Sequence, residues 1–272
     1  MKKLILVFTA IALGAAAYAQ ELTILHLNDT HSHIDPIRSG KHTGKGGVVE
    51  QAMYIDSVRL ADGRKNVLLL HAGDFSQGTS YFTELKGDIE IDVLNACRYD
   101  AVCLGNHEFD NGMDELARRL ADLRAPAVCA NYDFTGTPLA KHVSPYVILK
   151  KAGLKIGVIG LLPDLSSVVD AGIAEKLTFI NPVEVVNRYA DELKNQRGCD
   201  LVICLSHLGF DEEEFTDQMM APQVRNVDII VGGHSHTKIS EPVYINDLDG
   251  KKVVIVTDWK WGLQVGNMKV RL

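Results

Sequence analysis

The sequence predicts an α/β fold, and two patterns indicate it. From residue 21 onward, short runs of β-branched or aliphatic residues alternate with longer amphipathic stretches, which favours an α/β sheet over an all-β sandwich. Five of the apolar runs lead into loops that contain Asp, Asn or His, and loops beyond the strand ends of an open α/β sheet form its ligand crevice. Hydrophobic residues make up 46% of the 272 residues and charged residues 23%, so the chain can bury one sizeable core and is not disordered.

The individual elements follow from local patterns. Strands are expected at residues 22–27, 67–71, 101–104, 147–149, 155–161, 201–205, 228–231, 252–257 and 264–270, and helices at 47–60, 88–97, 113–123 and 182–196. The last helix has the clearest start, because Asn181 is a good N-cap and Pro182 suits the first helical position. No internal repeat or Pro/Ser-rich linker interrupts the pattern, so we expect one domain spanning residues 20–272.

The first nineteen residues have the pattern of a secretory signal peptide. Lys2 and Lys3 precede an apolar stretch at residues 4–17, and Ala-Tyr-Ala at 17–19 matches an A-x-A cleavage site. The apolar stretch is shorter than the roughly 20 residues that a membrane span requires, which favours cleavage over anchoring. We therefore expect a mature chain that begins at Gln20, is periplasmic or secreted, and is not inserted in a membrane.

Charge and cysteine content exclude other classes. The formal net charge is −7, so no basic footprint for nucleic acid is present, and any phosphorylated substrate would have to be attracted locally. The five cysteines form no CxxC pair, and most lie in or beside apolar runs. This favours buried thiols over a disulfide or a soft-metal site, although the sequence leaves open whether any pair is oxidised.

Seven side chains with metal-ligating atoms follow five of the expected strands. A single histidine after a strand is more often a hydrogen-bonded residue than a ligand, but here all the candidates stand at strand ends together. Their carboxylate, imidazole and amide donors suit harder divalent ions and Zn²⁺. Seven ligands are too many for one tetrahedral ion and suit two ions that share a bridging carboxylate. The seven are Asp29, His31, Asp74, Asn106, His207, His234 and His236.

These residues fall in five motifs: Asp29-x-His31, Gly73-Asp74-x-x-Gln77-Gly78, Gly105-Asn106-His107-Glu108-Phe109-Asp110, Ser206-His207 and Gly233-His234-Ser235-His236. Their order and spacing over residues 22–237 resemble those of the calcineurin-like metallophosphoesterases. The strings ILHLNDTHSH and GNHEFDNG resemble the 5′-nucleotidase branch of that superfamily, in its N-terminal catalytic domain only. The resemblance implies a four-layer α/β/β/α sandwich with the metals at one edge of the sheets.

The resemblance also implies roles for the site residues. Asp29, His31 and His236 would hold one ion, Asn106, His207 and His234 the other, and Asp74 would bridge the two. Water activated by the metals would attack phosphorus, His107 would stabilise the developing charge, and Asp110 would orient the ring of His107. The native metal stays open among Zn, Mn, Co, Fe and Mg.

Several further residues near these motifs are not assigned as metal ligands. Gln77 matches a family position near the metals but not a ligand, and His33 is ambiguous because it lies two residues from His31. For Trp259 and Trp261, packing on an edge strand is favoured over a small stacking surface. The family often has Arg near the position of Glu50, so no phosphate contact is assigned there.

Three functions compete at this stage. The favoured one is an exported dinuclear-metal phosphohydrolase acting as a 5′-nucleotidase, which releases phosphate from nucleoside 5′-monophosphates. The alternatives are a phosphodiesterase or nucleotide-sugar pyrophosphatase of the same superfamily, and a non-catalytic metal- or nucleotide-binding protein, against which His107 and Asp110 argue. Nucleotidases of the family usually carry a second domain that sandwiches the base. The expected partners are therefore a nucleotide or other phosphate ester and, as a further hypothesis, a separately encoded C-terminal nucleotide-binding domain.

Overall fold

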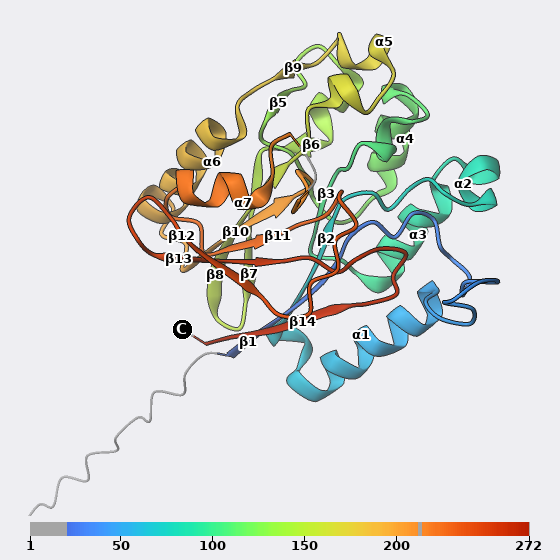
Figure 1. Cartoon of the computed structure of the whole chain (residues 1–272), viewed down its shortest axis with the longest axis horizontal. Helices are drawn as coiled ribbons and strands as arrows, with labels where there is room; N and C mark the ends of the chain where they lie inside the picture. Colours follow the sequence, from blue (N-terminus) through green and yellow to red (C-terminus); the bar gives the residue numbers. More distant parts are fainter. Residues whose placement is uncertain (1–20, 212–213, 272) are drawn as a thin grey trace, which may run out of the picture.

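The computed structural model describes residues 21–211 and 214–271. Two six-stranded sheets pack face to face, and helices cover their outer faces (Figure 1). A small two-stranded sheet pairs β5 (Tyr132–Asp133) with β9 (Thr178–Phe179). The α/β fold class and the helix, sheet, sheet, helix layering are thus confirmed. The predicted signal peptide and its cleavage site, residues 1–19, lie outside the described residues.

The first sheet has the strand order β14-β1-β2-β3-β4-β6. Its neighbours pair in parallel, except that β14 runs antiparallel to β1 at one edge. The strands are β1 (Glu21–Leu27), β2 (Val67–Ala72), β3 (Ala101–Cys103), β4 (Ala127–Val128), β6 (Val143–Ser144) and β14 (Gly266–Arg271). The carboxyl ends of β1, β2 and β3 therefore meet at one edge of this sheet.

The second sheet has the order β12-β13-β11-β10-β8-β7, with four parallel strands between two antiparallel edge strands. The strands are β7 (Tyr146–Lys151), β8 (Leu154–Leu161), β10 (Leu201–Ser206), β11 (Ile229–Val231), β12 (Val243–Asn246) and β13 (Lys252–Val256). Adjacent parallel strands again end at the same edge, so the loops that follow β8, β10 and β11 lie at one edge of this sheet.

Helices lie on both outer faces (Figure 1). They are α1 (Val48–Asp62), α2 (Ser80–Leu85), α3 (Asp88–Cys97), α4 (Met113–Asp122), α5 (Ala171–Ala174), α6 (Pro182–Asp191) and α7 (Asp217–Met220). Ile55 of α1 and Leu94 of α3 pack in one hydrophobic cluster with the first sheet. Val186 of α6 and Met220 of α7 pack in another with the second sheet.

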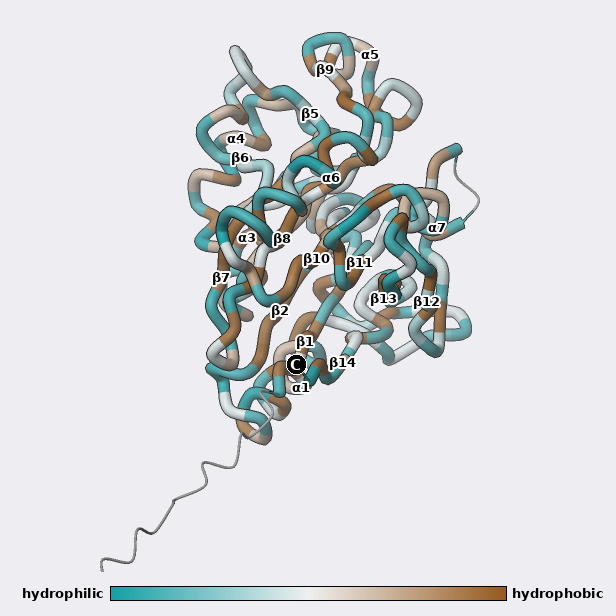
Figure 2. The backbone as a smooth tube through the Cα atoms, turned by 90° about the vertical axis from the view of Figure 1, so that its left-hand side faces the viewer, coloured by the Kyte–Doolittle hydropathy of each residue, from teal (hydrophilic) through white to brown (hydrophobic). Residues whose placement is uncertain are grey.

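The main core lies between the two sheets. Side chains such as Leu68 and Leu70 from β2 meet Ile203 and Leu205 from β10 there. Strands β2 and β10 are buried at every position, as expected for parallel strands covered on both faces, and they run as hydrophobic segments through the interior in Figure 2. Gly160 of β8 lets the sheets approach closely, because a Cβ there would stand 2.2 Å from the carbonyl oxygen of Val128.

Most of the expected elements are present. The start of α6 is confirmed in detail, since the Asn181 side chain accepts hydrogen bonds from the backbone N–H groups of Val183 and Glu184. The sequence did not predict α2, α5, β12 or the two-residue strands. All five cysteines are buried, as expected. Among the helices of residues 21–211 and 214–271, none has the length and apolar composition of a membrane span.

Candidate metal centre

Five loops converge where the two sheets end. Three follow β1, β2 and β3 of the first sheet, and two follow β10 and β11 of the second. These loops carry all seven residues that the sequence singled out as ligand candidates. The structure thereby brings together side chains separated by more than 200 positions, as in the contact between His31 and His236.

One group of candidates contains Asp29, His31 and His236, whose ligand atoms lie within 4.8 Å of one another. The Nε2 atoms of His31 and His236 are 2.8 Å apart. Asp29 Oδ1 lies 3.7 Å from His31 Nε2 and 3.5 Å from His236 Nε2. One carboxylate oxygen and two imidazole nitrogens thus point at a common centre.

A second group contains Asp74, His207 and His234, whose ligand atoms again lie within 4.8 Å of one another. Asp74 Oδ2 lies 3.0 Å from His207 Nε2 and 3.9 Å from His31 Nε2, so this oxygen faces both groups. Asn106 stands in the turn that holds Asp74, because the next residue, His107, donates its backbone N–H to Asp74 Oδ1.

The polar atoms of this cluster fit a metal centre. Asn106 Oδ1 is buried and has no hydrogen-bond partner among the described residues. Asp29 is fully buried and Asp74 nearly so, and His207 Nε2, also buried, faces Asp74 Oδ2. Buried carboxylates require a compensating positive charge. Two divalent cations would supply that charge and give the amide oxygen its missing partner.

The pKa values of the clustered residues also indicate that positive charge is stabilised at this site. Burial disfavours a charged imidazole, but Asp74 and Asp29 outweigh that effect and raise the pKa of His207 to about 10. Burial would also raise the pKa of Asp74, yet His207 and His31 hold it below its ordinary value. For His234, burial and the nearby His207 lower the pKa to about 4, which favours the neutral form that can ligate a metal.

Backbone strain is concentrated in the same loops. Asp29, His31, Asp74, His234 and His236 all have positive φ, between 48° and 75°. Non-glycine residues are uncommon in this region, and such strain gathers at functional sites where surrounding contacts hold it in place. The loops after β1, β2 and β11 therefore need specific supports.

Glu108 is the first of these supports, and its carboxylate is completely buried. It accepts hydrogen bonds from the backbone N–H groups of Asp74 (2.9 Å), Gly105 (2.6 Å) and Ser76 (2.9 Å). It thereby joins the loop after β2 to the loop after β3. At Gly105 a Cβ would lie 2.1 Å from Asp74 Oδ1, so only glycine allows this approach.

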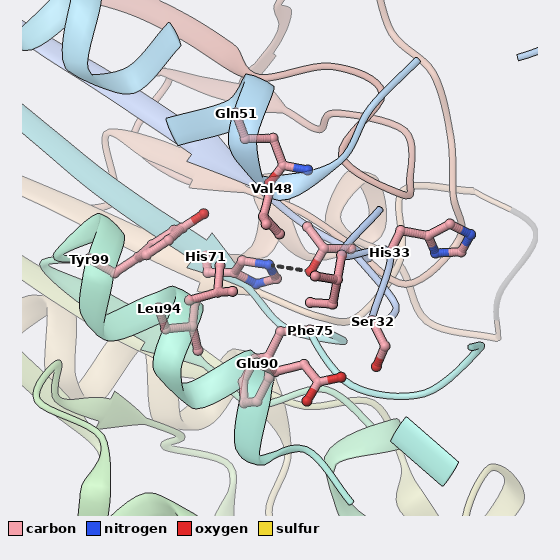
Figure 3. Close-up of a pocket in the computed structure, with 12 residues that line it drawn as sticks. Ser32, His33, Val48, Gln51, His71, Phe75, Glu90, Leu94 and Tyr99 are labelled. Carbon is pink, nitrogen blue, oxygen red and sulfur yellow. Dashed lines mark hydrogen bonds between the residues drawn. The ribbon is translucent and has the colours of Figure 1, made fainter. Parts of the chain in front are cut away.

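His71, the second support, lies near the end of β2 and lines the pocket shown in Figure 3. Its Nδ1 accepts a hydrogen bond from the backbone N–H of Gly73, and its Nε2 lies 3.1 Å from Thr30 Oγ1. Burial lowers the pKa of His71 to about 3, so the ring is neutral and can make both contacts. The pocket around it, which also contains Glu90, measures about 20 Å³ and is too small for a substrate.

His107 and Asp110 form a hydrogen-bonded pair beside the cluster. Their Nδ1 and Oδ2 atoms are 2.9 Å apart. Burial alone would lower the pKa of His107, but the hydrogen bond to Asp110 and the charge of Asp74 raise it above its ordinary value. The ring is partly exposed and its centroid lies 5.4 Å from that of His31, so it can reach a molecule bound at the cluster.

The segment between β13 and β14 also reaches the cluster. The backbone N–H of Trp261 donates to the carbonyl of Asp29, and its indole stacks on His33 at 4.8 Å. Lys260 places its Nζ 3.4 Å from His236 Nδ1. The interpretation of Trp261 as edge-strand packing is therefore corrected, because its ring lies against a loop of the candidate site.

Several supporting residues were missed by sequence reasoning. Glu108 lies inside a quoted motif, and its place in that motif was the available signal, whereas His71 is the last residue of the strand expected at 67–71. Lys260 carried no recognisable pattern. Gln77, expected near the metals, lies in the loop after β2 with φ at 78°.

Comparisons with known proteins agree with this geometry. A family model described as calcineurin-like phosphoesterase matches residues 22–238. A snake venom 5′-nucleotidase from Naja atra is 36% identical over 92% of this chain and 50% of its own length. The structure of a 5′-nucleotidase precursor from Thermus thermophilus has a TM-score of 0.82 at 34% identity, covering 92% of this chain and 51% of that one. The structure of an NAD nucleotidase from Haemophilus influenzae has a TM-score of 0.82 at 29% identity. The match covers 93% of this chain and 48% of that one. The chain spans about half the length of the curated relatives it matches.

Proposed function

The chain belongs to the calcineurin-like phosphoesterase family, and from that membership we propose a metal-dependent phosphohydrolase whose substrates are nucleoside 5′-monophosphates. The observation that carries the proposal is the position of Asp74 Oδ2, 3.0 Å from His207 Nε2 and 3.9 Å from His31 Nε2. A carboxylate that faces two ligand groups suits a site that binds two ions. The relatives named 5′-nucleotidase support the choice of substrate.

The proposed ligands divide between two ions. Asp29, His31 and His236 would hold the first, Asn106, His207 and His234 would hold the second, and Asp74 would serve both. When bound, divalent ions at such a site activate water and polarise the phosphoryl group. The donor set accepts Zn, Mn, Co, Fe or Mg, so availability decides the occupant.

His107 and Asp110 act on the substrate side. The raised pKa of His107 favours the protonated ring, which can donate a hydrogen bond to a phosphoryl oxygen or to the leaving oxygen. Asp110 accepts a hydrogen bond from Nδ1 of His107, so that Nε2 of the same ring faces the substrate. Glu108 and His71 hold the strained loops and do not touch the substrate in this proposal.

Two further parts of the proposal concern the cellular setting. Export to the periplasm or the medium is supported by the signal-peptide pattern of residues 1–19 and by the venom relative. The nucleotide-binding domain that the resemblance implies is proposed as the partner that binds the base. The curated relatives are about twice as long as the part that this chain matches, which leaves room in them for such a domain.

Phosphate release by the reconstituted chain tests the proposal. The protein is treated with chelator, resupplied with Mn²⁺, Co²⁺ or Zn²⁺, and given 5′-AMP or bis(p-nitrophenyl) phosphate. We expect metal-dependent release from 5′-AMP and a loss of about a hundredfold or more in His107→Ala. Preference for the diester would instead support the phosphodiesterase alternative, and nucleotide binding without turnover of either compound would support a binding protein.

A further inference from the structure

The two carboxylate oxygens of Asp29 have different neighbours. Oδ1 faces other ligand candidates, since it lies 3.7 Å from His31 Nε2 and 3.5 Å from His236 Nε2. Oδ2 accepts hydrogen bonds from the side-chain amide of Asn28 (2.6 Å) and from the backbone N–H of His234 (2.9 Å). The His234 N–H is shared with Oδ1, at 3.2 Å, whereas the Asn28 amide bonds to Oδ2. The carboxylate is thus oriented with one oxygen toward the cluster.

The amide of Asn28 has one possible orientation. The side chain is almost completely buried. Besides its bond to Asp29, Nδ2 donates to the carbonyl oxygen of Trp259 at 2.8 Å, and Oδ1 accepts the backbone N–H of Asp258 at 2.8 Å. Both hydrogens of the NH₂ group are therefore used. Because the carbonyl needs a donor and the N–H needs an acceptor, the amide cannot flip, and its NH₂ group must face Asp29.

The backbone that holds Asn28 is itself fixed. The carboxylate of Asp258 accepts the backbone N–H of Gly266 at 2.9 Å and lies against Nδ1 of His26. A Cβ at Gly266 would stand 2.2 Å from Nε2 of His26, so β14 packs tightly on β1 at this point. Because Asp258 is anchored to both strands, its backbone N–H offers Asn28 a partner that does not move.

The hydrogen bonds of Asp29 also join two strained loops. Asp29, after β1, has φ at 48°, and His234, after β11, has φ at 75°. Such conformations persist when surrounding contacts over-determine them. Asn28 donates to the same oxygen that accepts the His234 N–H, so it supports both loops. Without the Asn28 amide, Oδ2 loses the shorter of these two hydrogen bonds, and the carboxylate is freer to turn.

We propose that Asn28 is a positioning residue, which makes Asp29 present Oδ1 rather than Oδ2 to the metal ions. Asn28 acts through Asp29 and touches neither the substrate nor a metal ion. The inference rests on the proposed function for the presence of the ions, and it adds the residue that orients one of their ligands. Residues that orient ligands in this way typically contribute about 10- to 100-fold to metal affinity.

Co²⁺ binding by chelator-treated protein tests the inference. Competition with a chelating dye gives the affinity, and the visible absorption of bound Co²⁺ reports its ligands and geometry. In Asn28→Ala we expect the affinity to fall about 10- to 100-fold and the absorption bands to shift, because the orientation of Asp29 is no longer fixed. Asn28→Ser, the second variant, leaves a smaller gap in the core. Its hydroxyl is too short to replace the amide contact with Asp29, so we expect the same changes.

Asn131→Ala and Asn131→Ser are the matched controls. Asn131 is also fully buried, and its amide donates to the carbonyl oxygen of Leu162 and accepts the N–H of the same residue. Within residues 21–211 and 214–271, its side chain otherwise bonds to Cys129 and not to a ligand candidate. These variants should lower the free energy of unfolding but leave the Co²⁺ affinity and absorption bands unchanged, as Asn28 variants would if Asn28 served stability alone.

The outcomes separate this inference from the proposed function. Unchanged affinity and bands in folded Asn28→Ala or Asn28→Ser would overturn the inference and leave the proposed function intact. Wild-type protein that binds two Co²⁺ ions but hydrolyses no 5′-AMP would overturn the proposed function, and the spectra alone would then decide the role of Asn28. Wild-type protein that binds no Co²⁺ would overturn both.

Discussion

Asp110 Oδ2 lies 2.9 Å from Nδ1 of His107, three residues earlier in the chain. Of the influences that raise the pKa of His107 against the effect of burial, this hydrogen bond is the largest, followed by the charge of Asp74. The pair therefore favours the protonated form of the imidazole beside the candidate metal centre. Its charge is suited to a phosphoryl or leaving oxygen that becomes more negative during hydrolysis.

Replacement of Asp110 should shift the pH dependence of hydrolysis. Activity that needs protonated His107 falls as pH rises through the raised pKa of that residue. Asp110→Asn keeps a hydrogen-bond acceptor but removes the negative charge, so the pKa falls and the decline moves to lower pH. The profile of kcat/KM for 5′-AMP between about pH 5 and 9 measures this. A decline at the wild-type pH would contradict the role of the pair.

Glu108 is not one of the proposed metal ligands, but its replacement should weaken metal binding. In Glu108→Gln an amide NH₂ replaces one of the oxygens that accept the backbone N–H groups of Asp74, Gly105 and Ser76. We expect metal affinity to fall about 10- to 100-fold, as for other residues that orient ligands. Competition with a chelating dye measures the affinity, and Glu84→Gln on exposed α2 is the control. Equal affinities in the two variants would refute this role.

Removal of Lys260 should affect substrate binding more than turnover. Its ammonium group lies 3.4 Å from His236 Nδ1, close enough to the cluster to attract a phosphate. In Lys260→Ala we expect KM for 5′-AMP to rise about fivefold, or about 1 kcal/mol, with kcat nearly unchanged. Lys238→Ala removes a neighbouring cation that lies over the ring of Trp259 and serves as the control. A fall in kcat at constant KM would show that Lys260 acts in the chemical step instead.

A methyl group at Gly160 should destabilise the packing of the two sheets. Its Cβ would stand 2.2 Å from the carbonyl oxygen of Val128, and the other atoms that crowd it also belong to the backbone of Val128 and Cys129. Gly160→Ala should lower the free energy of unfolding by about 3 kcal/mol or more, as in severe overpacking. At Gly136 an added Cβ would meet no atom, but the residue has a positive φ. Gly136→Ala should therefore lower the free energy of unfolding by only about 1 kcal/mol. Urea unfolding compares the two, and equal losses would contradict the packing argument.

The sequence was most informative where local patterns coincide with tertiary position. The parallel strands β1, β2, β3, β10 and β11 all end near the site, so the ligand types that follow them could be assigned to one place before any contact was known. Strands β4 and β6 were not predicted because each is two residues long. Pairing with neighbouring strands decides such short elements, and a sequence window cannot show it.

The supporting contacts were less predictable for a different reason. Glu108 and His71 act by accepting hydrogen bonds from backbone N–H groups, and a backbone donor has no signature in the sequence. Trp261 and Lys260 reach the cluster from more than 200 residues beyond Asp29. Their roles depend on the antiparallel pairing of β14 with β1, which brings the end of the chain beside its beginning.

The most direct test of the account is a metal titration in which binding and hydrolysis are measured on the same samples. Chelator-treated protein receives increasing Mn²⁺, and bound metal per chain and phosphate release from 5′-AMP are recorded at each step. The account predicts two bound ions per chain, with hydrolysis reaching its maximum only when both are bound, and at most one ion in Asp74→Ala. Full activity with one ion, or hydrolysis that does not depend on metal, would contradict it.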